Sequence, residues 1–190
     1  MHGLGDCADS FIDVFQYPGH PSPFPINTKV IILNAPQMKV TINFGMVMNA
    51  WYDVSGIGAD LKDRYNKEDV KKSSERVRKI MEEEIEGPLK GDSSKLWIGG
   101  FSQGACMALH VGLQHEKPIG GIIACSGAMF DITEVKDEDV KKEKQPIFTY
   151  HGQMDFMIPY KLSLESYERL KEYKQFVHKS STTMGHSIEI

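Results

Sequence analysis

The pentapeptide Gly100-Phe101-Ser102-Gln103-Gly104 constrains the fold of this chain more than any other feature. It follows an apolar segment at residues 96–98, typical of a buried strand, and precedes a helical pattern at residues 103–115. A serine in a G-x-S-x-G sequence between a strand and a helix occupies a sharp turn, where the flanking glycines keep side chains away from the crowded backbone. We therefore expect the hydroxyl of Ser102 to project from the end of a strand as a nucleophile.

The rest of the chain alternates in the same way between short apolar segments and longer helical patterns. Residues 67–86 and 160–173 carry apolar side chains at helical spacing. Strands separated by helices predict an α/β protein with a mainly parallel sheet and helices on both faces, in which ligands bind at the carboxyl ends of the strands. We interpret residues 1–190 as one domain. The other predicted strands cover residues 29–33, 119–125, 146–150 and 175–179.

Charge and composition exclude several classes of function. With 22 lysines and arginines against 26 aspartates and glutamates, the net charge of -4 gives no attraction to a phosphate backbone, so we expect no nucleic-acid partner. No segment approaches the roughly 18 apolar residues of a membrane span, so we expect no stable membrane insertion. The 3 cysteines form no C-x-x-C pair, which is typical of reduced thiols in a cytoplasmic protein. No residue pattern predicts a metal site or a phosphate-binding loop, so we expect neither metal nor cofactor.

A serine is a weak nucleophile and needs a base. After a G-x-S-x-G serine, the acid and then the histidine follow along the chain. Of the 7 histidines, only His178 and His186 lie late enough. His178 lies inside an alternating strand pattern, whereas His186 follows Gly185 in the loop after that strand, where an imidazole can reach over the strand ends. His186 is therefore the predicted base.

The acid must lie between Ser102 and His186. Asp155 follows the strand at 146–150 through His151 and Gly152, so its carboxylate can accept the second imidazole N–H and fix the tautomer. Asp155 is the predicted acid. The alternatives are less well placed, either in a charged segment or several residues beyond a strand: Asp131, Asp137 and Asp139.

A tetrahedral intermediate also needs hydrogen-bond donors for its oxyanion. The backbone N–H of Gln103, directly after the nucleophile, supplies one at the start of the helix. The second donor has to come from a loop after an earlier strand, and His2-Gly3-Leu4-Gly5-Asp6 is the glycine-rich candidate. Within it, the backbone N–H of Leu4 is the predicted second donor.

Seven segments in the same order resemble a known family, the acyl-protein thioesterase/lysophospholipase group, also called the phospholipase/carboxylesterase family of the α/β-hydrolase superfamily. The resemblance implies an α/β-hydrolase fold and hydrolysis of fatty thioesters on protein cysteines, lysophospholipids or small carboxyl esters, without a cofactor. The segments are HGLGD at 2–6, NAP at 34–36, VTINFGMVMNAWYD at 40–53, GFSQG at 100–104, CSG at 125–127, HGQMD at 151–155 and MGHS at 184–187.

The same resemblance implies roles for individual residues. It implies a triad of Ser102, Asp155 and His186, with Leu4 and Gln103 as oxyanion donors. It also implies an apolar channel for the acyl chain, for which the matching residues are Trp51, Ile57 and Met157. Two departures bear on the substrate: Ala105 stands where the family has glycine, and residues 128–130 after CSG read Ala-Met-Phe.

The ends of the chain also differ from the family. There an apolar strand precedes HGLGD and lies between the strands matching residues 29–33 and 96–98, and a further helix follows the position of Ile190. We expect both to be absent, so that the domain is truncated at both ends and its open sheet edges favour homo-oligomers. The alternative to an active serine hydrolase is a non-catalytic or weakly active paralogue that binds acyl groups or a protein partner.

Overall fold

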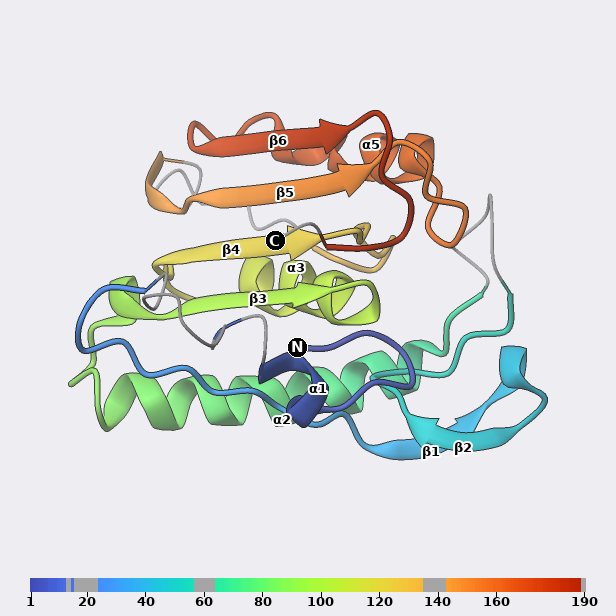
Figure 1. Cartoon of the computed structure of the whole chain (residues 1–190). Coiled ribbons are helices and arrows are strands. Elements are labelled where there is room, and N and C mark those ends of the chain that lie inside the picture. Colours follow the sequence, from blue (N-terminus) through green and yellow to red (C-terminus); the bar gives the residue numbers. More distant parts are fainter. Residues whose placement is uncertain (13–14, 16–23, 57–63, 135–142, 189–190) are drawn as a thin grey trace.

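The computed structural model describes residues 1–12, 15, 24–56, 64–134 and 143–188 of the chain. Its centre is a parallel sheet in the order β3-β4-β5-β6 (Figure 1). The alternation of strands and helices in the sequence correctly predicts these four strands, with small shifts of their ends. They are formed by Trp97–Phe101, Gly121–Cys125, Ile147–Gly152 and Phe176–Ser181.

Three helices flank this sheet: α2 (Lys67–Glu86), α3 (Gln103–Gln114) and α5 (Tyr160–Tyr167). The side chain of Asn66 caps α2 by accepting from the backbone N–H groups of Glu68 and Asp69. The predicted helix at 160–173 is shorter than expected, because a 3-10 turn at Glu168–Leu170 follows α5. None of the helices in the described residues is both long and apolar enough to cross a bilayer.

The buried core lies between the sheet and these helices. Gly112 of α3 lies so close to β4 that a Cβ there would come within 2.7 Å of Ile122, and α2 packs against α3. The Tyr167 ring of α5 packs against His178 on the same face of the sheet. An α/β fold with a parallel sheet and flanking helices is thus confirmed.

The opposite face of the sheet differs from the expected arrangement of helices on both sides. Side chains that alternate with the core-facing ones point to this face, and Trp97, Ile123 and Val177 are 55%, 40% and 47% exposed. A side chain packed under a helix loses nearly all of its exposed area. These exposures show that the three long helices leave this face partly open.

The predicted strand at 29–33 is wrong. This segment is irregular, and Val30 and Ile31 are 42% and 41% exposed. A strand needs a partner for its N–H and C=O groups. In the described residues β3 is the edge strand, and beyond it only Met1 pairs with its backbone: the Met1 amine donates to Gly99 O at 2.8 Å, and Phe101 N donates to Met1 O at 3.1 Å.

Five shorter elements were not predicted. Strands β1 (Gln37–Val40) and β2 (Met46–Asn49) form an antiparallel hairpin around a 3-10 turn at Thr41–Asn43. Helix α1 (Ala8–Phe11) follows the N-terminal glycine-rich segment, and a 3-10 turn at Ser93–Lys95 precedes β3. Of the strand residues of the hairpin only Val40 is buried, so the hairpin carries no strong hydrophobic pattern that sequence reasoning could detect.

Candidate active site

Ser102 sits on a strained turn between β3 and α3. Its backbone has φ 55° and ψ -121°, a conformation that L-residues rarely adopt. The turn requires its glycines: a Cβ on Gly100 would lie 2.3 Å from the backbone of Gly104, and a Cβ on Gly104 would lie 2.3 Å from the Met1 carbonyl oxygen. The Ser102 N–H donates to Cys125 O at 3.0 Å, which fastens the turn to β4.

A chain of hydrogen bonds connects the hydroxyl of Ser102 to a buried carboxylate. His186 Nε2 lies 2.8 Å from Ser102 Oγ, and His186 Nδ1 lies 2.7 Å from Asp155 Oδ2. Ser102 follows β3, Asp155 comes from the turn after β5 and His186 from the loop after β6, so the three side chains meet at the carboxyl ends of strands of one parallel sheet. The ring of Phe101 packs against the imidazole of His186, with centroids 5.0 Å apart.

The Asp155 carboxylate is held on both oxygens. Its Oδ1 accepts from the backbone N–H groups of Met157 and Ile158, both at 2.9 Å, while its Oδ2 faces His186. Burial by itself raises the pKa of Asp155, but the nearby donor groups of His151, His186 and Ile158 outweigh it. The pKa therefore lies well below its usual range, and the carboxylate is ionised at neutral pH.

The alternative acids and bases have other partners. His178 on β6 contacts Thr149 Oγ1 at 2.8 Å and the Tyr160 hydroxyl at 3.3 Å, and burial lowers its pKa. Asp131 accepts from the hydroxyl of Tyr65 and from Lys67. Neither contacts Ser102 or His186. The other two acids considered, Asp137 and Asp139, lie outside the described residues.

The N-terminal glycine-rich segment lies against the Ser102 turn. A Cβ on Gly3 would lie 3.3 Å from Ser102 Cβ, and Gly5 N donates to Asn49 O at 2.8 Å. Within the described part of the chain, the backbone N–H groups of Leu4 and Gln103 donate to no protein acceptor. Both are thus available to a ligand beside Ser102.

The three residues expected to line an acyl channel differ in their surroundings. Trp51 has no exposed surface, and its indole N–H donates to His2 O at 2.9 Å, so it packs the N-terminal segment rather than facing a substrate. Ile57 lies outside the described residues. Met157 is 46% exposed beside Asp155, and two neighbours that sequence reasoning missed, Met154 and Phe156, are 51% and 79% exposed.

Sequence reasoning also missed His151 of β5. This side chain has no exposed surface, and its Nε2 atom lies 3.2 Å from Asp155 Oδ2 and 2.9 Å from Ile158 O. The available signal was its place four residues before Asp155, in the HG-x-x-D segment. It therefore touches the same carboxylate oxygen as His186.

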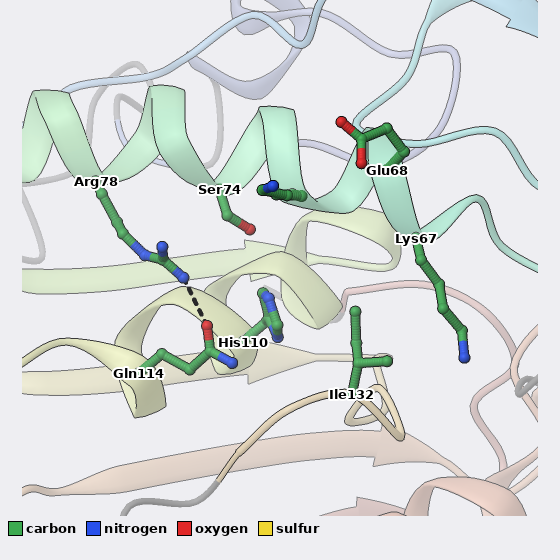
Figure 2. Close-up of a pocket in the computed structure, with 8 residues that line it drawn as sticks. Lys67, Glu68, Ser74, Arg78, His110, Gln114 and Ile132 are labelled. Atoms are coloured by element: carbon green, nitrogen blue, oxygen red, sulfur yellow. Dashed lines mark hydrogen bonds between the residues drawn. The ribbon is translucent and has the colours of Figure 1, made fainter.

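A cavity of about 400 Å³ lies elsewhere, between α2 and α3 (Figure 2). Arg78 of α2 donates to the Gln114 side chain of α3 at 2.6 Å, and burial together with the nearby Arg78 charge lowers the pKa of His110 to about 4. Since none of its lining residues belongs to the Ser102 site, this cavity is separate from it. Its lining consists of Lys67, Glu68, Lys71, Ser74, Arg78, His110, Gln114 and Ile132.

Comparisons with known proteins place this geometry in a family. The family model described as Phospholipase/Carboxylesterase matches residues 1–190. Acyl-protein thioesterase 1 of Emericella nidulans is 31% identical over 179 residues, which cover 90% of this chain and 74% of that protein. Acyl-protein thioesterase 1 of Saccharomyces cerevisiae is 31% identical over 193 residues, which cover 98% of this chain and 83% of that protein.

Solved structures agree with this relationship. The crystal structure of Arabidopsis thaliana SOBER1 superposes with a TM-score of 0.80 at 26% identity, covering 99% of this chain and 89% of that one. The crystal structure of Zea mays acyl-protein thioesterase 2, at 23% identity and a TM-score of 0.76, shares the fold. The chain belongs to the phospholipase/carboxylesterase family and is an ester or thioester hydrolase with the α/β-hydrolase fold.

Proposed function

We propose that this protein hydrolyses acyl thioesters or carboxyl esters through an acyl-enzyme on Ser102. The observation that carries the proposal is the unbroken hydrogen-bonded chain from Asp155 through His186 to Ser102 Oγ. An ionised carboxylate only accepts hydrogen bonds, so the proton of a neutral His186 lies on Nδ1 and the lone pair of Nε2 faces the serine hydroxyl. This is the tautomer that a general base needs.

Four steps follow from this arrangement. Ser102 Oγ attacks the acyl carbonyl carbon while His186 Nε2 takes the hydroxyl proton. The resulting imidazolium is stabilised by the buried charge of Asp155, and the backbone N–H groups of Leu4 and Gln103 donate to the oxyanion. Collapse of the tetrahedral intermediate expels the thiolate or alkoxide, which receives the proton from His186. Water then attacks the acyl carbonyl carbon while His186 Nε2 takes its proton. Collapse of this second tetrahedral intermediate releases the acid, and the proton passes from His186 to Ser102 Oγ.

The apolar surface beside the site supports a substrate with an acyl chain. Met154, Phe156 and Met157 are exposed on the turn that carries Asp155. Methionine and phenylalanine side chains bind acyl chains through apolar contact, and methionine adapts to irregular shapes. We include Met157 among the residues that line the acyl site. An acylated protein is the proposed substrate class, since two relatives at 31% identity are acyl-protein thioesterases.

The rival function is a protein that binds acyl groups without hydrolysing them. It requires only an apolar surface and makes no use of an ionised carboxylate, an imidazole and a hydroxyl in linked contact. The strained backbone of Ser102 costs stability, which a binding protein has no reason to retain. The geometry therefore favours the enzyme.

Labelling and hydrolysis together test the proposal. We expect wild-type protein to react covalently with a fluorophosphonate and to release p-nitrophenol from an acyl ester with an initial burst. Ser102→Ala should abolish labelling and lower kcat by about 10⁴-fold or more. Palmitoyl-cysteine peptide hydrolysis, compared with short-chain esters, then ranks the substrates. Folded wild-type protein that neither labels nor hydrolyses any of them would refute the proposal.

A further inference from the structure

His151 is a fully buried histidine in contact with the Asp155 turn. Its Nε2 atom lies 2.9 Å from the carbonyl oxygen of Ile158 and 3.2 Å from Asp155 Oδ2. Both of these oxygens can only accept a hydrogen bond: the first belongs to a backbone carbonyl, and the second to an ionised carboxylate. Nε2 must therefore carry a proton, which it donates to the Ile158 carbonyl while facing the carboxylate.

The second ring nitrogen fixes the tautomer. His151 Nδ1 is buried and has no hydrogen-bond partner within the described residues. A proton on Nδ1 would be a buried donor without an acceptor, which is unfavourable. The ring of Tyr160 packs beside the imidazole ring of His151, with centroids 5.9 Å apart. His151 is thus held as the tautomer with a single proton, on Nε2.

The proton on His151 Nε2 links strand β5 to two groups of the turn that carries Asp155: the Ile158 carbonyl and the Asp155 carboxylate. Ile158 accepts from His151 through its carbonyl group and donates to Asp155 Oδ1 through its own N–H at 2.9 Å. At the same time, His151 faces Oδ2, the oxygen that contacts His186 Nδ1 at 2.7 Å. One buried ring therefore fixes the loop that carries the carboxylate and touches the oxygen that orients the base.

We propose that His151 is a positioning residue, which holds the Asp155 carboxylate at the angle and with the charge distribution that His186 requires. The inference rests on the proposed function, because it assigns His151 a part in the same hydrolysis. His151 contacts neither Ser102 nor a reacting atom, so it acts through Asp155 alone.

Two substitutions at the same position separate this role from packing. His151→Leu removes the N–H but keeps an apolar side chain, whereas His151→Gln places an amide N–H near the original position of Nε2. We expect kcat for a p-nitrophenyl ester to fall by about 10- to 100-fold in His151→Leu, with KM unchanged. His151→Gln should restore most of the lost activity. Equal losses in the two folded variants would contradict the proposal.

The pH dependence supplies a readout that packing alone does not change. The titratable groups around the carboxylate are His151 on β5 and His186 after β6, with Tyr160 of α5 packed on His151. Without the His151 N–H, the charge of Asp155 acts more strongly on His186 and favours its protonated form. The acid limb of kcat/KM should therefore move to higher pH in His151→Leu, whereas a packing defect lowers kcat at every pH.

The matched control is His110→Leu. His110 is also buried and bonded to one side chain, Thr133 Oγ1 at 2.9 Å, but it lies eight residues along α3 from Ser102, about 12 Å by helix rise. We expect His110→Leu to keep the wild-type kcat and to leave the acid limb of its kcat/KM profile at the wild-type pH. A folded His151→Leu variant that behaves as His110→Leu does would overturn the proposed role of His151. The proposed function is tested separately, by the activity and fluorophosphonate labelling of the wild-type protein.

A measurement on the unmodified protein covers the case in which His151→Leu does not fold. Nitrogen chemical shifts of histidine distinguish the two neutral tautomers. The structure requires the proton of His151 on Nε2, so an observed Nδ1–H tautomer refutes the inference. This test needs no variant and no activity, and its result is therefore independent of whether the protein hydrolyses esters.

Discussion

The side-chain amide of Gln103 fastens the backbone of Trp51 to the Ser102 turn. Gln103 Oε1 accepts from Trp51 N at 3.0 Å, and Gln103 Nε2 donates to Tyr52 O at 2.8 Å. Trp51 in turn donates its indole N–H to His2 O. The residue whose backbone N–H is proposed for the oxyanion therefore also anchors the segment that leads to the second donor, at Leu4.

Removing this amide should destabilise the fold. Gln103→Ala deletes two buried hydrogen bonds and leaves the Trp51 N–H and the Tyr52 carbonyl without their partner. We expect the free energy of unfolding to fall by about 2–4 kcal/mol, measured by urea denaturation. Gln114→Ala is the control, because Gln114 is only partly buried and bonds to Arg78 at the edge of the cavity. Gln114→Ala should lower the free energy of unfolding by about 1 kcal/mol or less. Equal losses in the two variants would contradict the buried role of Gln103.

Asp155 and Asp131, two of the four candidate acids, should differ in their effect on activity. Asp155→Asn cannot fix the required tautomer of His186, and we expect kcat to fall by about 10⁴-fold, as for the corresponding change in a serine protease. Asp131→Asn alters only contacts with Tyr65 and Lys67 and should keep kcat within about threefold of the wild type. Steady-state ester hydrolysis measures both. A strong loss in Asp131→Asn would exclude Asp155 as the sole acid.

Gly104 should not tolerate a side chain. A Cβ there would lie 2.3 Å from Met1 O and 2.6 Å from His2 O, so alanine has to displace the segment that carries Leu4. We expect kcat of Gly104→Ala to fall by about 10²-fold, since small displacements of a catalytic donor are costly. Gly45→Ala is the control: it meets nothing within 4 Å, and its φ of +76° costs only stability, about 1 kcal/mol. An unchanged rate of hydrolysis in Gly104→Ala would show that the N-terminal segment with Leu4 takes no part in catalysis.

Asp155 should also make the stability of the fold depend on pH. Its pKa in the folded protein lies below the value of about 4 expected in the unfolded chain. The ionised form therefore stabilises the fold above about pH 4, and this contribution is lost as the pH falls toward the folded pKa. We expect the stability advantage of the wild type over Asp155→Asn, measured by urea titrations, to be full at pH 6 and to shrink below pH 4. An advantage that grows in acid would contradict the depressed pKa.

The amino-acid sequence determined the features that depend on neighbours along the chain. The glycines around Ser102 indicated a tight turn, because only a residue without a Cβ fits where the strand, the turn and the helix meet. Apolar spacing correctly predicted α2, α3 and four strands of the sheet, because the period of a buried face is written directly in the order of residues. The G-x-S-x-G, HG-x-x-D and GHS segments indicated Ser102, Asp155 and His186 as candidates.

The tertiary structure decided what each residue faces. Residues 29–33 have a strand pattern, but the described part of the chain offers them no backbone partner, so they remain irregular. Trp51 looks like a lining residue in sequence, yet it is wholly buried and bonded to His2. His151 looks ordinary beside a strand end, and only the turn that brings Asp155 and Ile158 back onto β5 gives its ring a role. Hydrogen bonds and burial depend on the three-dimensional proximity of distant segments, which local sequence patterns do not encode.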